Sequence, residues 1–202
     1  MSQPFEIIAC AADVYLAFEG EAFPTVDAVP GGNWVLLGAA GTRNQKIGGV
    51  KITPTQEVAK HKTTGSLGPV KGFRTAAGES VEVTIEDFRL EVLAKKMNLP
   101  GIREVAAASG VAGYKSMGMW PGFEMQVWAL LVRVPASPEA DGLAMQRQYP
   151  RVIETGSLEQ IFNNDGEVVA TKFVFDALED PNASSNAERF GTWVVQTAPA
   201  LP

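Results

Sequence analysis

The sequence predicts a mainly β protein: an antiparallel β-sandwich or barrel with one packed α-helix and a long extended loop. Short apolar segments rich in β-branched and aromatic residues recur along the 202 residues, and turn residues separate them. The 20 glycines and 13 prolines suit many strands and turns better than a helix bundle. Strands do not alternate with helices, which argues against a parallel βαβ sheet. A hydrophobic content of 46% is enough for a normal core.

Roughly eight segments have the pattern of β-strands. The clearest is 79–86 (ESVEVTIE), whose valines and isoleucine alternate with polar residues, as expected of a half-buried strand. The other strands are predicted at 5–18 with a break near 11–13, 33–38, 48–53, 123–135, 144–154 with a bend at Pro150, 167–177 and 191–198. Loops are predicted at 19–32, 41–46 and 135–142, and a hairpin turn at 164–166.

Residues 88–98 have the period of a helix instead. The predicted apolar face consists of Leu90, Leu93, Ala94 and Met97. Asp87 is expected to cap the start of this helix, and Asn98 marks its end. A second short helix is predicted at 102–109, and 110–122 has no assignable pattern.

The segment 54–78 is too polar and too long to belong to the core of its own subunit. It carries four bases, Lys60, Lys62, Lys71 and Arg74, against the single acid Glu57, so its net charge is +3 in a chain of net charge −6. A segment of this length without a core of its own is usually functional or disordered. We interpret it as an arm that packs on an acidic surface outside its own subunit. The alternative is a loop whose bases are solvated.

No catalytic motif is recognisable. The sequence has no G-x-S-x-G elbow, no phosphate loop ending in GK[ST] and no H-E-x-x-H zinc motif. One cysteine, Cys10, and one histidine, His61, argue against a Cys/His metal site. Asp176, Glu179 and Asp180 lack the ligand spacing of a calcium loop and are interpreted as a solvated acidic face. We therefore expect neither enzymatic activity nor a cofactor.

The N-terminus has no basic region followed by a long apolar run, so we expect no signal peptide. No window approaches the roughly 18 consecutive apolar residues of a membrane span. The composition therefore predicts a soluble, acidic protein made in a cytoplasm. An acidic body with one basic segment is also not the pattern of a nucleic-acid-binding protein.

The order of several segments resembles that of the major tail tube proteins of tailed phages, of the siphophage type. These segments are VYLAF (Val14–Phe18), NWVLLG (Asn33–Gly38), GGVKIT (Gly48–Thr53), the strand and helix of Glu79–Asn98, and the closing Lys172–Ala198. The resemblance covers most of the chain and lies in order and pattern, not in one signature. Residues 101–122 do not match a feature of that family.

The resemblance implies one tail-tube domain over 1–202, with an inter-subunit arm at 54–78. Subunits would form hexameric rings, strands from six copies would build an inner barrel, and rings would stack head-to-tail into a tube in the virion tail. DNA would pass through without sequence-specific binding, and no membrane is involved. Other implied partners are the tape measure, tail terminator and distal tail proteins. The implied contacts between rings are Lys60, His61, Lys62, Lys71, Phe73 and Arg74.

Two alternatives remain open. A tube protein of a contractile injection or secretion system meets the same physical requirements as a phage tube. A β-barrel module that binds a small ligand would instead use Trp120, Phe123 and Trp128 as an apolar pocket.

Overall fold

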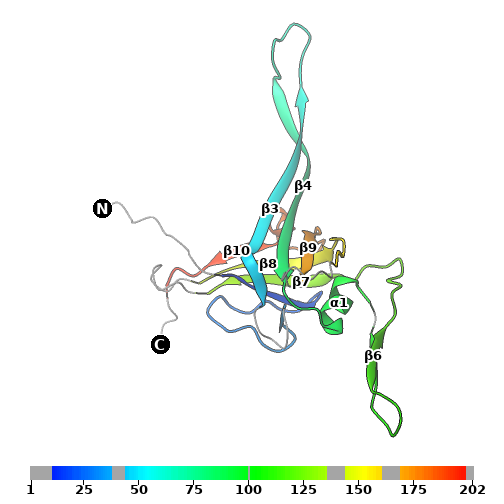
Figure 1. Cartoon of the computed structure of the whole chain (residues 1–202). Coiled ribbons are helices and arrows are strands. Elements are labelled where there is room, and N and C mark those ends of the chain that lie inside the picture. Colours follow the sequence, from blue (N-terminus) through cyan, green and yellow to red (C-terminus); the bar gives the residue numbers. More distant parts are fainter. Residues whose placement is uncertain (1–10, 38–43, 100, 136–143, 161–168, 199–202) are drawn as a thin grey trace.

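The computed structural model describes residues 11–37, 44–99, 101–135, 144–160 and 169–198, and it is mainly β with antiparallel pairing (Figure 1). The elements are β1 (Asp13–Phe18), β2 (Val35–Leu36), β3 (Gln45–His61), β4 (Lys71–Ile85), α1 (Leu90–Lys96), β5 (Ile102–Val105), β6 (Tyr114–Met117), β7 (Trp128–Val134), β8 (Met145–Glu154), β9 (Thr171–Ala177), a 3-10 turn (Asn186–Glu188) and β10 (Thr192–Val195). The predicted fold class is confirmed.

Most strands belong to one sheet, in which β8 pairs with three other strands. The order is β2-β1-β7-β8-β9-β4-β3, and β10 also pairs with β8. One edge of β8 serves two neighbours in turn, β10 at Met145–Gln148 and β9 at Val152–Glu154. The inner faces of the two halves of the sheet meet in one core, so the arrangement is sandwich-like. Across the described residues, β2 and β3 do not pair with each other, and the sheet is not closed into a barrel.

The core lies between these halves and follows the alternation of the strands. Its buried side chains are Val14, Leu16, Leu37, Val81, Val83, Ile85, Val92, Leu130, Val132, Tyr149, Val152, Phe173 and Phe175. Alternate residues of a strand point to the same face, so the predicted stripe Val81, Val83 and Ile85 is buried together. Burial also raises the pKa of the Tyr149 hydroxyl to about 12.

The strand predictions agree with the structure in position more than in length. β7 begins at Trp128 and leaves the predicted start of that strand outside it. The predicted bend at Pro150 coincides with a register shift, because Trp128 pairs with Val152 while Leu130 pairs with Tyr149. The predicted final strand is present as β10. The predicted hairpin turn at 164–166 lies outside the described residues.

Helix α1 is shorter than predicted and presents a different face. It begins at Leu90 with Arg89 at the N-cap, while the predicted cap, Asp87, accepts a hydrogen bond from the backbone N–H of Arg89 at 3.1 Å. The buried residues of the helix are Val92, Leu93 and Lys96, so only Leu93 of the predicted stripe lies at its centre. Lysines on a helix are usually exposed, and the burial of Lys96 is explained by its partner in the sheet.

Lys96 forms a buried ion pair with Glu154 at the end of β8. Lys96 Nζ donates to Glu154 Oε1 at 2.6 Å, and the two side chains are only 1% and 4% exposed. The same Oε1 accepts the backbone N–H groups of Gly156 and Val174 at 3.0 and 2.9 Å. Burial lowers the pKa of Lys96, and the Glu154 carboxylate opposes that shift. A Cβ at Gly156 would lie 2.6 Å from Lys96 Nζ and 3.0 Å from Glu154 Oε1, so a larger residue there would displace the pair from this geometry.

The predicted second helix at 102–109 is wrong. Residues Ile102–Val105 form β5, which pairs with β6 in a separate two-stranded sheet. The turn between them closes through the bridge Ala108↔Val111, with Gly110 at a φ of +77°. The alanines of this segment favour a helix in isolation. Pairing with β6, which has no recognisable pattern in the sequence, outweighs that local preference.

Neutralising one member of the buried pair should destabilise the fold. In Lys96→Met the buried carboxylate loses its cation, and in Glu154→Gln the buried cation loses its carboxylate, so each variant should lose about 3–5 kcal/mol of unfolding free energy. The double variant removes both charges and keeps an oxygen for the two backbone N–H groups, so it should recover most of that loss. Urea unfolding measures all three variants. Additive losses in the double variant would contradict the coupling.

Candidate assembly interface

The predicted arm is a β-hairpin that projects from the body. Strands β3 and β4 pair from Val50↔Val83 to His61↔Lys71 with one bulge, so the ladder extends far into the segment expected to be an extended loop. Strand β9 accompanies β4 only as far as the pair Ser80↔Asp176. Beyond that point, the described residues provide no third strand, and Figure 1 shows the hairpin standing away from the sheet. The arm therefore begins where the sequence places it.

Every residue from 54 to 77 is exposed except Ser66 and Gly68, which are partly buried. Pairing explains how such a polar segment stays ordered, because the cross-strand ladder satisfies backbone N–H and C=O groups. The sequence leaves open whether this segment is a hairpin or irregular, and the structure shows a hairpin. Residues 54–61 and 71–78 contain few of the β-branched and aromatic side chains that mark strands, so the pattern does not reveal the ladder.

A bulge interrupts the arm near its middle. Glu57 pairs with Ala76 and Val58 pairs with Arg74, which leaves Thr75 as the extra residue. Bulges bend a strand and increase its local twist. The bulge therefore sets the direction in which the outer half of the arm points.

The tip of the arm, residues 62–70, is held by hydrogen bonds of its own. Val70 N–H donates to the carbonyl of His61 at 2.8 Å, and Ser66 N–H donates to the carbonyl of Thr63 at 3.1 Å. The Ser66 hydroxyl donates to the carbonyl of Gly68 at 2.7 Å. These bonds give the tip a defined shape, which an interface requires.

The arm distributes the predicted contact residues over two faces. Paired residues share a face, so His61, Lys71 and Phe73 lie on one side, with Lys71 Nζ 5.0 Å from the centre of the Phe73 ring. Lys60 and Arg74 lie on the other side, next to Val58. Lys62 lies at the start of the tip. The structure thus does not gather the basic residues into one patch.

The arm also exposes apolar side chains that the charge count does not reveal. Leu67 at the tip is fully exposed, and Val58, Val70 and Phe73 are about half exposed or more. Exposed apolar residues gathered on a projecting element indicate a contact surface. Except for Phe73, they were not among the predicted contact residues, although four large apolar residues in a mostly polar segment are a usable signal.

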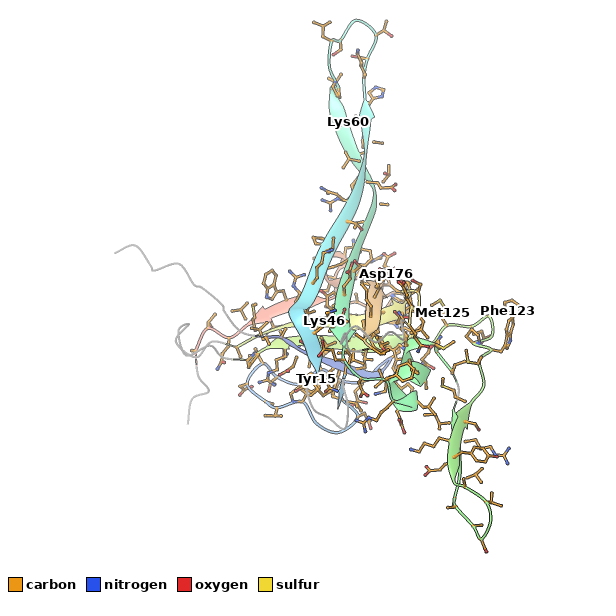
Figure 2. The ribbon with its side chains drawn as sticks, in the orientation of Figure 1. Tyr15, Lys46, Lys60, Phe123, Met125 and Asp176 are labelled. Carbon is orange, nitrogen blue, oxygen red and sulfur yellow. The ribbon has the colours of Figure 1, made fainter. Side chains whose placement is uncertain are left out.

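A second hairpin, β5–β6, projects on the side of the body opposite the arm (Figure 1). Lys115 of β6 ties it to α1 through an ion pair with Glu91 at 2.9 Å. The connection from β6 to β7 carries a group of exposed side chains that we call the aromatic patch: Met119, Trp120, Phe123 and Met125. Trp120 is 73% exposed and Phe123 96% exposed, and the two rings meet edge to face at 5.9 Å. Figure 2 shows Phe123 on an outlying loop and Met125 closer to the body.

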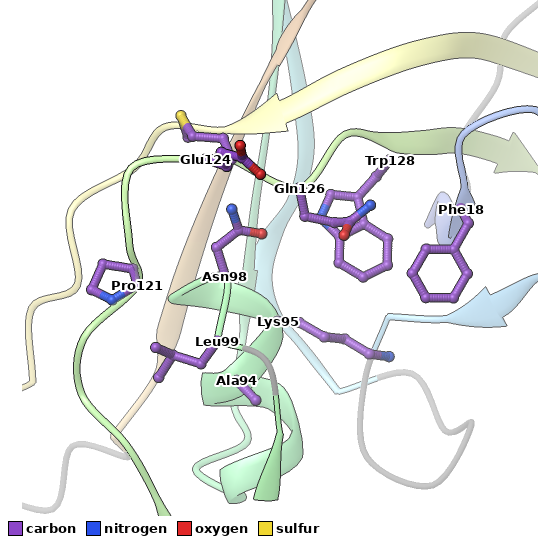
Figure 3. Close-up of a pocket in the computed structure, with 10 residues that line it drawn as sticks. Phe18, Ala94, Lys95, Asn98, Leu99, Pro121, Glu124, Gln126 and Trp128 are labelled. Carbon is purple, nitrogen blue, oxygen red and sulfur yellow. The ribbon is translucent and has the colours of Figure 1, made fainter.

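A cavity of about 580 Å³ adjoins the aromatic patch (Figure 3). Met125 belongs to both, and Trp128, stacked on Phe18 at 5.2 Å, forms another wall. Asn98 at the end of α1 also lines the cavity, and its Oδ1 is buried with no hydrogen-bond partner in the described part of the chain.

The predicted ligand pocket is only partly present. Trp128 lines the cavity, whereas Trp120 and Phe123 are not among its lining residues. Among the described residues, no three His, Cys, Asp or Glu side chains lie close enough to hold a metal ion. None of the helices in the described ranges is long and apolar enough to cross a membrane.

No protein-family model matches the sequence, and no curated protein matches it. Among solved structures, the chain is similar to a chain of the anti-feeding prophage (AFP) baseplate, determined by cryo-EM with six-fold symmetrisation. The TM-score is 0.49, the identity is 9%, and the match covers 97% of each chain. At this similarity the match does not assign a function.

Removing the arm should leave the body folded. Replacing residues 56–77 by Asn-Gly joins the register partners Thr55 and Gly78 through a two-residue hairpin turn. Because the removed residues are exposed and lie outside the core, the thermal midpoint should change by less than about 4 °C. A control variant applies the same Asn-Gly replacement to residues 62–70 only, between the register partners His61 and Lys71, and so removes the tip alone. Loss of cooperative unfolding in circular dichroism would show that the arm supports the core.

Proposed function

We propose that this protein is the structural subunit of a tail tube, which assembles with identical copies into stacked hexameric rings around a DNA conduit. The observation that carries this proposal is the arm, an ordered and almost entirely exposed hairpin that continues past its last contact with β9. An isolated two-stranded hairpin is only marginally stable in water. An ordered arm of this kind is best explained by a surface on another subunit.

The length of the arm suits such a contact. At about 3.3 Å per residue, the stretch from Pro54 to His61 alone spans about 23 Å. That distance exceeds the radius of gyration of about 17 Å expected for a folded chain of this length. The arm is therefore long enough to reach well onto a neighbouring subunit.

The sheet edges support ring formation. In the described part of the chain, β2 and β3 end the sheet and each pairs on one side only. Open edges invite pairing with another chain, and ring closure satisfies them. Head-to-tail contacts between copies produce rings or filaments.

The charge of the chain suits a conduit for DNA. Its net charge is −6, although the segment 54–78 carries +3. An acidic wall repels phosphate, so DNA would slide without binding. The tape measure, tail terminator and distal tail proteins would then be partners at the lumen and at the two ends of the tube.

Charge reversal on the arm should impair stacking and spare folding. The variant Lys60→Glu/Lys62→Glu/Lys71→Glu/Arg74→Glu changes only exposed side chains, so its circular dichroism should match the wild type. Its attraction for an acidic neighbour becomes repulsion, so stacked rings in negative-stain images at low salt should become rare.

Matched controls separate charge from shape. Lys60→Arg/Lys62→Arg/Lys71→Arg keeps every charge and should form tubes normally. Lys60→Glu/Arg74→Glu and Lys62→Glu/Lys71→Glu make the same change in charge at different places on the arm, and so identify the side that meets the neighbour. Normal tubes from the fourfold Glu variant would refute the electrostatic contact. Wild-type protein that stays monomeric at high concentration would refute the tube.

A further inference from the structure

We infer that the tip of the arm, residues 62–70, docks on the aromatic patch and the adjoining cavity of the next copy. This inference rests on the proposed function and names the surface that receives the arm. The two surfaces would then be the two halves of one head-to-tail contact.

The direction of the two hairpins makes this a contact between copies. The arm and β5–β6 project on opposite sides of the body, and the aromatic patch lies beside the base of β5–β6 (Figures 1 and 2). A tip that points away from its own patch cannot reach it. When copies stack along the arm, the arm of one copy runs past the β5–β6 hairpin of the next, toward the base of that hairpin.

The two surfaces match in polarity. Leu67 is fully exposed and Val70 is 62% exposed, so the tip presents aliphatic groups to solvent. The patch presents the rings of Trp120 and Phe123, which are also largely exposed. Aromatic side chains that bury aliphatic groups at the centre of a contact are typical of interface hot spots. Contact between copies would remove both apolar surfaces from water.

The cavity next to the patch supplies depth. Its volume of about 580 Å³ can take an aliphatic side chain with part of its backbone, so Leu67 of a second copy can enter it.

Charge complementarity gives the same pairing. Lys62 is the first residue of the tip, Lys60 lies two residues before it, and the segment 54–78 carries +3. Glu124 is exposed and lines the cavity, which Lys95 of α1 also lines. Because Glu124 is next to Phe123 in the chain, the acid is the charged group that adjoins the patch. Opposite charges at the rim of an apolar contact guide orientation and speed association.

A disulfide trap tests the contact directly. In a Cys10→Ser background, Leu67→Cys with Phe123→Cys should give a reducible ladder of linked subunits when assembled protein is oxidised. The control pairs Leu67→Cys with Val29→Cys, which is 83% exposed and lies outside the patch, and should give little ladder. Equal ladders from both pairs, or none from the first pair in assembled protein, would overturn the inference.

A mixing experiment separates this inference from the proposed function. Leu67→Glu/Val70→Glu disables the tip, and Trp120→Glu/Phe123→Glu disables the patch, while both should keep the wild-type circular dichroism. Each variant alone should form rings that do not stack, and a mixture should form ring pairs, because one intact tip meets one intact patch. Normal tubes from the patch variant would overturn the docking site and leave the tube standing. Wild-type protein without rings would overturn both.

Discussion

Strand β4 belongs both to the sheet of the body and to the arm, and the rest of the molecule depends on where the sheet ends and the arm begins. From Ser80 to Ile85 it lies between β3 and β9, with Val81, Val83 and Ile85 in the core. From Lys71 to Glu79 the same strand pairs only with β3 in the described part of the chain. The pairing of β3 with β4 thus begins in the body, where the core supports it, and continues into the arm, which has no core of its own. This explains how a polar, basic segment can be ordered.

Sequence reasoning found the position of the arm but not its form. The limits 54–78 follow from loss of the alternating apolar pattern, and β9 stops accompanying β4 at the same place. The sequence leaves the hairpin form open, because the ladder of the arm continues from the strands of the body and does not depend on local strand propensity. The same reason explains β5–β6, where an alanine-rich segment pairs with a strand that has no pattern of its own. The burial of Lys96 could not be predicted from the sequence, because its partner Glu154 is 58 residues away.

The candidate site shows a similar division. Composition identifies the basic residues, since charge can be counted without knowing the fold. Which of them share a face depends on cross-strand register, and the bulge at Thr75 changes that register within the arm. The exposure of Trp120 and Phe123 could not be predicted either, because large aromatic residues in a β protein are usually buried. Their position on a connection outside the sheet leaves them in solvent.

The two kinds of residue on the arm have different physical roles. Because Lys60 and Arg74 lie on one face and Lys71 on the other, no single flat surface can engage all the charges at once. Charges spread around a projecting hairpin act at a distance, and they favour encounter with an acidic body over a wide range of approach angles. Specificity then has to come from short-range packing, which the arm offers at its tip, where Leu67 is fully exposed. On this basis, salt should change how fast subunits associate, and substitutions at the tip should change how long they remain together.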